Sequence, residues 1–264
     1  MTLLPSTVKG LILDMDGVLW TDTVPIGNLP LTFARIKELD LAVTLATNNS
    51  TRTVDQYVEK LHGFGVSVEP WQVVTSSLAV ANMMSRQLPA GAPVFAIGED
   101  GLIEALKAAE FEVLSVENAE KAEAVVVGID KRVNFDKMRE ATLLVRAGKP
   151  FFATNPDKTF PTPRGQIPGA GAWISVIVTA TDVQPMIAGK PFPYLLELAL
   201  ERMGTTKDST YVVGDRLETD IAGGQALGCP TCMVLSGIAT LAEAQVRMPK
   251  IDIIAKDLGT LVGT

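Results

Sequence analysis

The chain has 264 residues, of which 47% are hydrophobic and 20% charged, a balance typical of a soluble globular protein with room for two domains. The formal net charge of −7 argues against nucleic acid as a partner, although local cations and a metal still allow a small phosphorylated ligand. No apolar run has membrane-spanning length and the N-terminus lacks a secretion signal, so we expect a cytoplasmic protein with no membrane partner.

The first predicted strand, within residues 8–16, ends in two aspartates. An apolar run over 11–13 is followed by Asp14 and Asp16, and Gly17 then favours a sharp turn. Ligands bind at the carboxyl ends of strands in open α/β sheets, where two neighbouring carboxylates need a bound cation or a shared proton. The alternative is that both aspartates are ordinary turn formers.

Strand-like runs alternate with amphipathic helical patterns along the chain. This alternation predicts an α/β fold with a mostly parallel sheet. The later strands are expected within residues 41–49, 72–76, 94–98, 123–128, 151–155, 210–215 and 230–237. Helices are expected within residues 31–39, 54–61, 101–109, 135–148 and 191–204, the last closed by Gly204 as a C-cap.

The middle of the chain, residues 78–178, is predicted to be an inserted second αβ domain, leaving 1–77 and 179–264 as the core domain. Pro and Gly cluster near its edges, at 88–93 and 161–171, where the pattern is too irregular for a helix. One apolar segment is expected to lie in the core of the inserted domain. It comprises Trp173, Ile174, Val176 and Ile177.

Polar residues also end the strand predicted over 41–49. The hydroxyl of Thr47, the amides of Asn48 and Asn49 and their backbone N–H groups could cradle phosphate oxygens before the next helix. The alternative, helix capping by the hydroxyl residues within 50–53, explains those residues well but residues 47–49 less well.

Lys190 stands immediately before a predicted helix whose first turn carries Pro191 and Pro193. A cation at a helix N-terminus opposes the helix dipole, and an anionic ligand would reverse that penalty. The alternative is a solvated surface lysine, which is the usual position of this residue type.

Two further aspartates follow the strand predicted over 210–215. Asp215 could supply a third oxygen to a hard cation such as magnesium. Asp220 has two interpretations, an acid stabilised by the helix dipole or a partner for Lys190 or for metal-bound water.

The two cysteines, Cys229 and Cys232, form a C-x-x-C pair, which is half of a zinc site. A thioredoxin-like pair would begin a helix, but Cys232 leads into a predicted strand. We therefore expect both to be small core residues.

The order of DMDGV (14–18), TNN (47–49), GKP (189–191) and GDRLETDI (214–221) resembles the haloacid dehalogenase superfamily of phosphotransferases. ATNPD (153–157), PGAG (168–171) and the kind of insertion resemble its NagD-like, 4-nitrophenylphosphatase branch. The resemblance covers nearly the whole chain. It implies a Rossmann-like core and a large αβ cap of the C2 type, inserted after the third core strand.

Carried onto this sequence, the resemblance implies that Asp14 is the nucleophile that becomes an aspartyl phosphate and that Asp16 is the general acid and base. It further implies that Mg²⁺ is held by the Asp14 carboxylate, the Asp16 backbone carbonyl and the Asp215 carboxylate. Thr47 and Lys190 would bind the phosphoryl group, with Asn48 and Asn49 beside them. Superfamily ion pumps have Thr in place of Asp16, so Asp16 predicts rapid hydrolysis.

The resemblance thus predicts a phosphatase acting on a small phosphorylated metabolite, with cap residues determining specificity. The candidates are Asn155, Asp157, Phe160 and Gly169. Vertebrate pyridoxal-phosphate phosphatases of this branch have His before Pro where Phe160 precedes Pro161, so their substrate does not transfer directly. Caps of this branch often mediate dimers, which allows a homodimer here.

The sequence leaves two other function classes open. Receiver-like signalling modules also combine Asp, Thr and Lys around magnesium, but they are small single domains whose phosphorylated Asp lies on a later strand. A binding protein that has lost activity on this fold is also possible, although every motif position needed for catalysis is filled.

Overall fold

A computed structural model describes residues 2–162 and 164–264 of the chain. These residues form two compact units. The first contains the residues up to Thr47, Val54–Val74 and Lys190–Thr264, and the second contains Asn48–Thr53 and Thr75–Gly189. None of the helices in the described ranges is long and apolar enough to cross a membrane.

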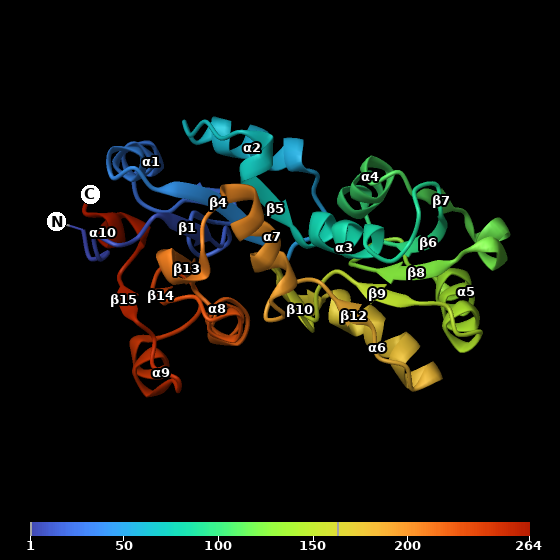
Figure 1. Ribbon diagram of the computed structural model, residues 1–264. Coiled ribbons are helices and arrows are strands. Elements are labelled where there is room, and N and C mark those ends of the chain that lie inside the picture. The colour runs from blue at the N-terminus through green and yellow to red at the C-terminus, as the bar shows by residue number, and fades with distance from the viewer. Residues whose placement is uncertain (1, 163) are drawn as a thin grey trace. The chain divides into compact units, whose positions relative to one another are not determined.

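The first unit is built on a six-stranded sheet (Figure 1). In order across the sheet its strands are β15 (Ile253–Ala255), β14 (Thr231–Val234), β13 (Thr210–Gly214), β1 (Gly10–Leu13), β4 (Ala42–Thr47) and β5 (Val73–Thr75). β1 pairs in parallel with both β13 and β4, and β13, β14 and β15 also pair in parallel. The predicted Rossmann-like parallel sheet is therefore confirmed.

The strand order reverses direction at β1. β4 and β5 follow on one side of β1, whereas β13 to β15 extend on the other. In open α/β sheets such a switch point leaves a crevice at the carboxyl ends of the two strands. Asp14 directly follows β1 and Asp215 directly follows β13, so both aspartates lie at this switch point.

The helices of the first unit have recognisable capping residues at some of their ends. Asn28 caps the first of them by accepting a hydrogen bond from the Leu31 N–H, and the predicted C-cap Gly204 is left-handed at φ 65°. They are α1 (Leu29–Glu38), α2 (Val54–Gly63), α7 (Tyr194–Met203), α8 (Ala222–Leu227), α9 (Leu241–Val246) and α10 (Leu258–Val262). A short hairpin of β2 (Trp20–Thr21) and β3 (Val24–Pro25) follows the Asp14 turn.

The second unit has its own parallel sheet of five strands (Figure 1). Across the sheet they are β12 (Met186–Ile187), β9 (Phe151–Ala153), β8 (Ala124–Val127), β6 (Pro93–Ile97) and β7 (Glu112–Leu114). Its helices are α3 (Ser76–Ser85), α4 (Asp100–Ala108), α5 (Phe135–Arg146) and α6 (Ala170–Thr181). The irregular stretch before α6 forms an antiparallel hairpin of β10 (Thr159–Thr162) and β11 (Gly165–Pro168).

Two details of the second unit differ from the sequence-based expectations. Besides Asn48–Thr53, the unit extends from Thr75 to Gly189, beyond the expected limits of 78 and 178. It ends later than expected because β12 pairs with β9. The prediction that Val176 lies in the core is wrong, since this residue is 45% exposed. Ile174 and Ile177 are buried at three-residue spacing on one helix face, and Val176 lies off that face.

Candidate active site

Asp14 is held at the end of β1 by the backbone. Its N–H donates to the Val213 carbonyl at 2.8 Å, which continues the pairing with β13 one residue beyond the strand. The chain then turns, with the Met15 carbonyl accepting from the Leu19 N–H at 2.8 Å and Gly17 at φ 85°. This left-handed conformation favours glycine, which explains the residue type after Asp16.

Asp215 is enclosed by two glycines. Its Oδ2 accepts a hydrogen bond from the Ile238 N–H at 2.9 Å, in the loop after β14. A Cβ atom at Gly17 or Gly237 would lie 2.4 or 2.0 Å from this Oδ2, closer than side chains tolerate. Glycine at both positions therefore lets the backbone approach and fix one oxygen of Asp215.

The Lys190 ammonium lies between two carboxylates. It is 2% exposed and donates to Asp14 Oδ1 and Asp220 Oδ1, both at 2.6 Å, and to the Ala46 carbonyl at 2.9 Å. These three acceptors match the three N–H donors of a lysine. The alternative of a solvated surface lysine is therefore wrong.

The local setting of Lys190 also differs from the prediction. The helix was expected to include Pro191 and Pro193 in its first turn, but α7 begins at Tyr194 and Pro193 occupies the N-cap position. Lys190 is therefore part of the irregular segment before the helix. Its charge is balanced by Asp14 and Asp220 rather than opposed by the helix dipole.

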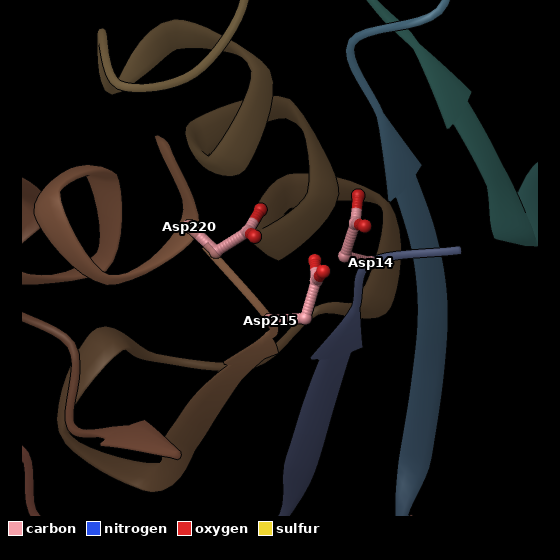
Figure 2. Close-up of side chains that lie close together, drawn as sticks. All are labelled: Asp14, Asp215 and Asp220. Atoms are coloured by element: carbon pink, nitrogen blue, oxygen red, sulfur yellow. The ribbon is translucent and has the colours of Figure 1, made fainter. Parts of the chain in front are cut away.

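Three carboxylates converge at this place, those of Asp14, Asp215 and Asp220 (Figure 2). One oxygen from each lies within 4.8 Å of the others. With all groups ionised, three carboxylates and the Lys190 ammonium leave two uncompensated negative charges. A divalent cation would balance them.

The pKa values reflect this crowding of buried charge. Burial raises the pKa of Asp14 well above its usual value, against the lowering effect of Lys190. Burial, together with the charge of Asp220, raises the pKa of Asp215 to about 6. Burial works to lower the pKa of Lys190, but the charges of Asp14 and Asp220 outweigh it and raise this pKa above its usual range.

The donor set fits a hard divalent cation. Asp215 Oδ1 is buried and makes no hydrogen bond within the described part of the chain, whereas its Oδ2 is held by Ile238. A buried carboxylate oxygen without a partner is costly unless a proton or a metal satisfies it. Magnesium and calcium prefer oxygen ligands of this kind.

Asp16 and Asp220 differ in their surroundings. Asp16 is exposed and its Oδ1 accepts a hydrogen bond from Trp20 Nε1 at 2.8 Å, so its carboxylate is not one of the three that converge. Asp220 is 1% exposed and lies in a π-helical turn, Leu217–Ile221, that leads into α8. Of its two interpretations, the structure supports the partner of Lys190.

The three polar residues at the end of β4 and directly after it divide between the units. Thr47 is buried at the end of β4, in the first unit, whereas Asn48 and Asn49 belong to the second. Asn49 Oδ1 accepts from both the N–H and the hydroxyl of Thr51, at 2.9 and 2.8 Å, as in an Asx turn. Asn48 Nδ2 donates to Asp157 Oδ2 at 2.8 Å.

Two of the cap candidates take part in the same hydrogen-bonded cluster as Asn48. Asn155 Nδ2 also donates to Asp157 Oδ2, at 2.6 Å, so one carboxylate oxygen orients both amides. Gly169 precedes α6, and a Cβ there would lie 2.4 Å from the Asp157 carbonyl. Phe160 lies in β10 opposite Ile167, outside this cluster.

Several groups that shape the site were not predicted from the sequence. These are the Ala46 carbonyl, the Ile238 N–H and the Trp20 indole. Two of these groups have a signal in the sequence. A glycine just after a predicted strand indicates the loop of Ile238, and a tryptophan stands four residues after Asp16. The residue type of Ala46 gives no indication that its backbone carbonyl accepts a hydrogen bond from Lys190.

Comparison with known proteins identifies the class. The family model described as haloacid dehalogenase-like hydrolase matches residues 11–112, and a second model of such hydrolases matches residues 187–261. An acid sugar phosphatase of Staphylococcus aureus is 38% identical over 237 residues, which cover 90% of each chain. The chain therefore belongs to the haloacid dehalogenase-like hydrolases.

Solved structures refine this assignment. A p-nitrophenyl phosphatase from Archaeoglobus fulgidus superposes with a TM-score of 0.90 at 33% identity, covering 97% of this chain and 98% of that one. NagD from Escherichia coli K-12 gives 0.87 at 31% identity, covering 98% of both chains. A magnesium complex of a glycerol phosphate phosphatase from Mycobacterium tuberculosis gives 0.89 at 32%, covering 97% and 76%. Within its family, this chain is a NagD-like phosphatase.

Proposed function

We propose that this chain is a magnesium-dependent phosphomonoesterase for small phosphorylated metabolites, with Asp14 as the nucleophile. The observation that carries the proposal lies at the switch point of the sheet, where the buried Lys190 ammonium is 2.6 Å from Asp14. Asp215, at the same switch point, has a buried Oδ1 without a hydrogen bond among the described residues. A carboxylate becomes an effective nucleophile when it is oriented and its charge is compensated. Lys190 supplies both conditions for Asp14.

Mg²⁺ would be held by the carboxylates of Asp14 and Asp215 and by the backbone carbonyl of Asp16, and when bound it would neutralise the phosphoryl oxygens. Ile238 orients Asp215 for this role through its N–H. Asp220 holds Lys190 in place by an ion pair at 2.6 Å.

The remaining roles concern proton transfer and phosphoryl binding. Attack by Asp14 on phosphorus would form an aspartyl phosphate, while Asp16 protonates the leaving oxygen and then activates a water molecule for hydrolysis. Lys190 and Thr47 would bind the phosphoryl oxygens, with Asn48 and Asn49 as further partners. Because Lys190 already has three acceptors, contact with phosphate requires the exchange of one of them.

The substrate class is proposed from the relatives. Their names include an acid sugar phosphatase and a glycerol phosphate phosphatase, which favours sugar and polyol phosphates as the first compounds to test. Asn155, Asp157, Phe160 and Gly169 are the proposed specificity residues of the second unit. The two parallel sheets and the family assignment disfavour a receiver-like signalling module, which would hold its phosphate without turnover.

The proposal is tested by assaying the purified chain on 4-nitrophenyl phosphate and a panel of sugar and polyol phosphates. We expect activity that EDTA abolishes and Mg²⁺ restores. Asp14→Asn should remove nearly all turnover, whereas Asp55→Asn, a matched change at an exposed position in α2, should leave it unchanged. Magnesium-dependent activity in Asp14→Asn would refute the nucleophile, and a long-lived phosphoprotein without turnover would favour the signalling alternative.

A further inference from the structure

Trp20 contacts Asp16 through the only hydrogen-bond donor of its side chain. The indole ring is 1% exposed, and its Nε1–H donates to Asp16 Oδ1 at 2.8 Å. Asp16 itself is exposed, so without this bond its side chain would be free to rotate in solvent. We propose that Trp20 is a positioning residue that orients Asp16 for proton transfer, an inference that rests on the proposed role of Asp16.

The bond also distinguishes the two oxygens of Asp16. An indole N–H can only donate, so it holds Oδ1 as its acceptor. Oδ2 is the oxygen that this bond leaves for contact with the leaving group. A general acid is efficient when its proton lies within hydrogen-bond reach of the leaving oxygen, and Trp20 fixes one end of the group that delivers it.

The surroundings of Trp20 keep the indole in place. Its ring stacks on Tyr57 with centroids 6.5 Å apart and planes 18° from parallel, and it packs against Phe64 at 5.9 Å. Lys60 Nζ lies 3.9 Å from the centroid of the indole and donates to the Asp22 carbonyl at 2.8 Å. Lys60 thus fastens the β2–β3 hairpin to α2.

The Lys60 cation acts on the indole electronically as well. A cation over the ring face attracts the π electrons. This withdrawal makes the N–H a stronger donor, because the nitrogen lone pair is part of the π system. An anionic acceptor strengthens the hydrogen bond further. Lys60 therefore strengthens the hydrogen bond from Trp20 to Asp16 in addition to packing on the indole ring.

The leaving group of the substrate provides the test. A 4-nitrophenolate leaves with little help from an acid, whereas an alkoxide leaves only when it is protonated. General acid catalysis is commonly worth about 10²–10⁴-fold, so Trp20→Phe, which keeps a ring but removes the donor, should lower kcat/KM for the best alkyl phosphate of the panel by roughly 10–100-fold. The loss for 4-nitrophenyl phosphate should be about threefold or less.

Phe64→Leu is the matched control. It removes a ring that packs on Trp20 but leaves the N–H bond to Asp16, so it should lower thermal stability and leave the ratio of the two kcat/KM values unchanged. An equal loss on both substrates in Trp20→Phe, or no loss, would overturn the positioning role. A ratio that changes as much in Phe64→Leu as in Trp20→Phe would also overturn it, because loss of packing would then explain both results.

A parallel variant separates this inference from the proposed function. If Asp16→Asn lowers kcat/KM on alkyl phosphates and Trp20→Phe does not, only the role of Trp20 fails. If Asp16→Asn has no effect, the proposed role of Asp16 fails as well.

Should Trp20→Phe not fold, NMR of the Asp16→Ala variant provides the measurement. The indole proton of Trp20, assigned with Trp71→Phe and Trp173→Phe, should move upfield when its acceptor is removed. An unchanged resonance would contradict the proposal.

Discussion

Replacing Gly17 with alanine should displace part of the proposed metal site, and the structure gives the size of this displacement. The added Cβ would lie 2.4 Å from Asp215 Oδ2, and such contacts are essentially never shorter than 3.0 Å. The carboxylate of Asp215 or the turn at Gly17 must therefore shift by about 0.6 Å or more, whereas metal–ligand distances vary by only about 0.2 Å. We expect a weaker affinity for Mg²⁺ by about 10–100-fold, as for other disturbances of ligand orientation.

The same substitution also has a cost in backbone strain, and Gly27→Ala measures that cost alone. Gly17 has φ 85° and Gly27 has φ 68°, but a Cβ at Gly27 would meet no atom within 4 Å. A left-handed alanine costs about 1–2 kcal/mol in either place. Gly27→Ala should therefore show this backbone cost alone, a fall in Tm of roughly 2–8 °C, and Gly17→Ala should lose at least as much stability.

The assay is the dependence of phosphatase activity on Mg²⁺ concentration, measured beside the thermal unfolding of each variant. Gly17→Ala should need more Mg²⁺ for half-maximal activity, and Gly27→Ala should need the same amount as the wild type. Equal Mg²⁺ dependence in the two variants would refute the reasoning, because the strain would then be the only effect of the methyl group.

Three further results are expected. Lys190→Met leaves the buried carboxylate of Asp220 and the half-buried carboxylate of Asp14 without their ammonium, so urea unfolding should show a loss of about 3–5 kcal/mol; an unchanged midpoint would contradict these ion pairs. Burial raises the pKa of Cys229 to about 11 and of Cys232 to about 12, so iodoacetamide at pH 8 should label neither thiol until urea unfolds the chain, as mass spectrometry would show. Ile177→Ala should destabilise the second unit by about 2–5 kcal/mol and Val176→Ala by about 0.5 kcal/mol or less, and equal losses in the two variants would refute the assigned helix face.

The parallel sheets could be predicted because their strands are continuous apolar runs, a pattern that arises when both faces of a sheet are covered. The run at 11–13, for example, lies in β1, and the two aspartates at the switch point follow from knowing which strands are neighbours. β12 gave no such signal, since Met186–Ile187 is short and follows a proline. The second unit therefore ends later than its composition indicates.

The surroundings of Lys190 show where sequence reasoning stops. Its residue type and its place before α7 indicate a cation near the site, but burial between Asp14 and Asp220 depends on contacts between segments far apart in the sequence. The same holds for Asn48, whose amide is bonded to Asp157, 109 residues away. Local patterns cannot specify such pairs, because any strand end could have supplied the partner.

The grouping of Asn48–Thr53 with the second unit has a consequence for chimeric proteins. Ser76 and Ser77 donate to the carbonyls of Asn48 and Ser50, at 2.6 and 3.2 Å, and Asp157 accepts from the Asn48 amide. A cap transplanted from a relative as the single segment 75–189 would depend on the host chain for the partners of these bonds, because they lie in the separate piece Asn48–Thr53. Exchange of specificity between relatives therefore requires two grafts, the long insertion and this six-residue loop.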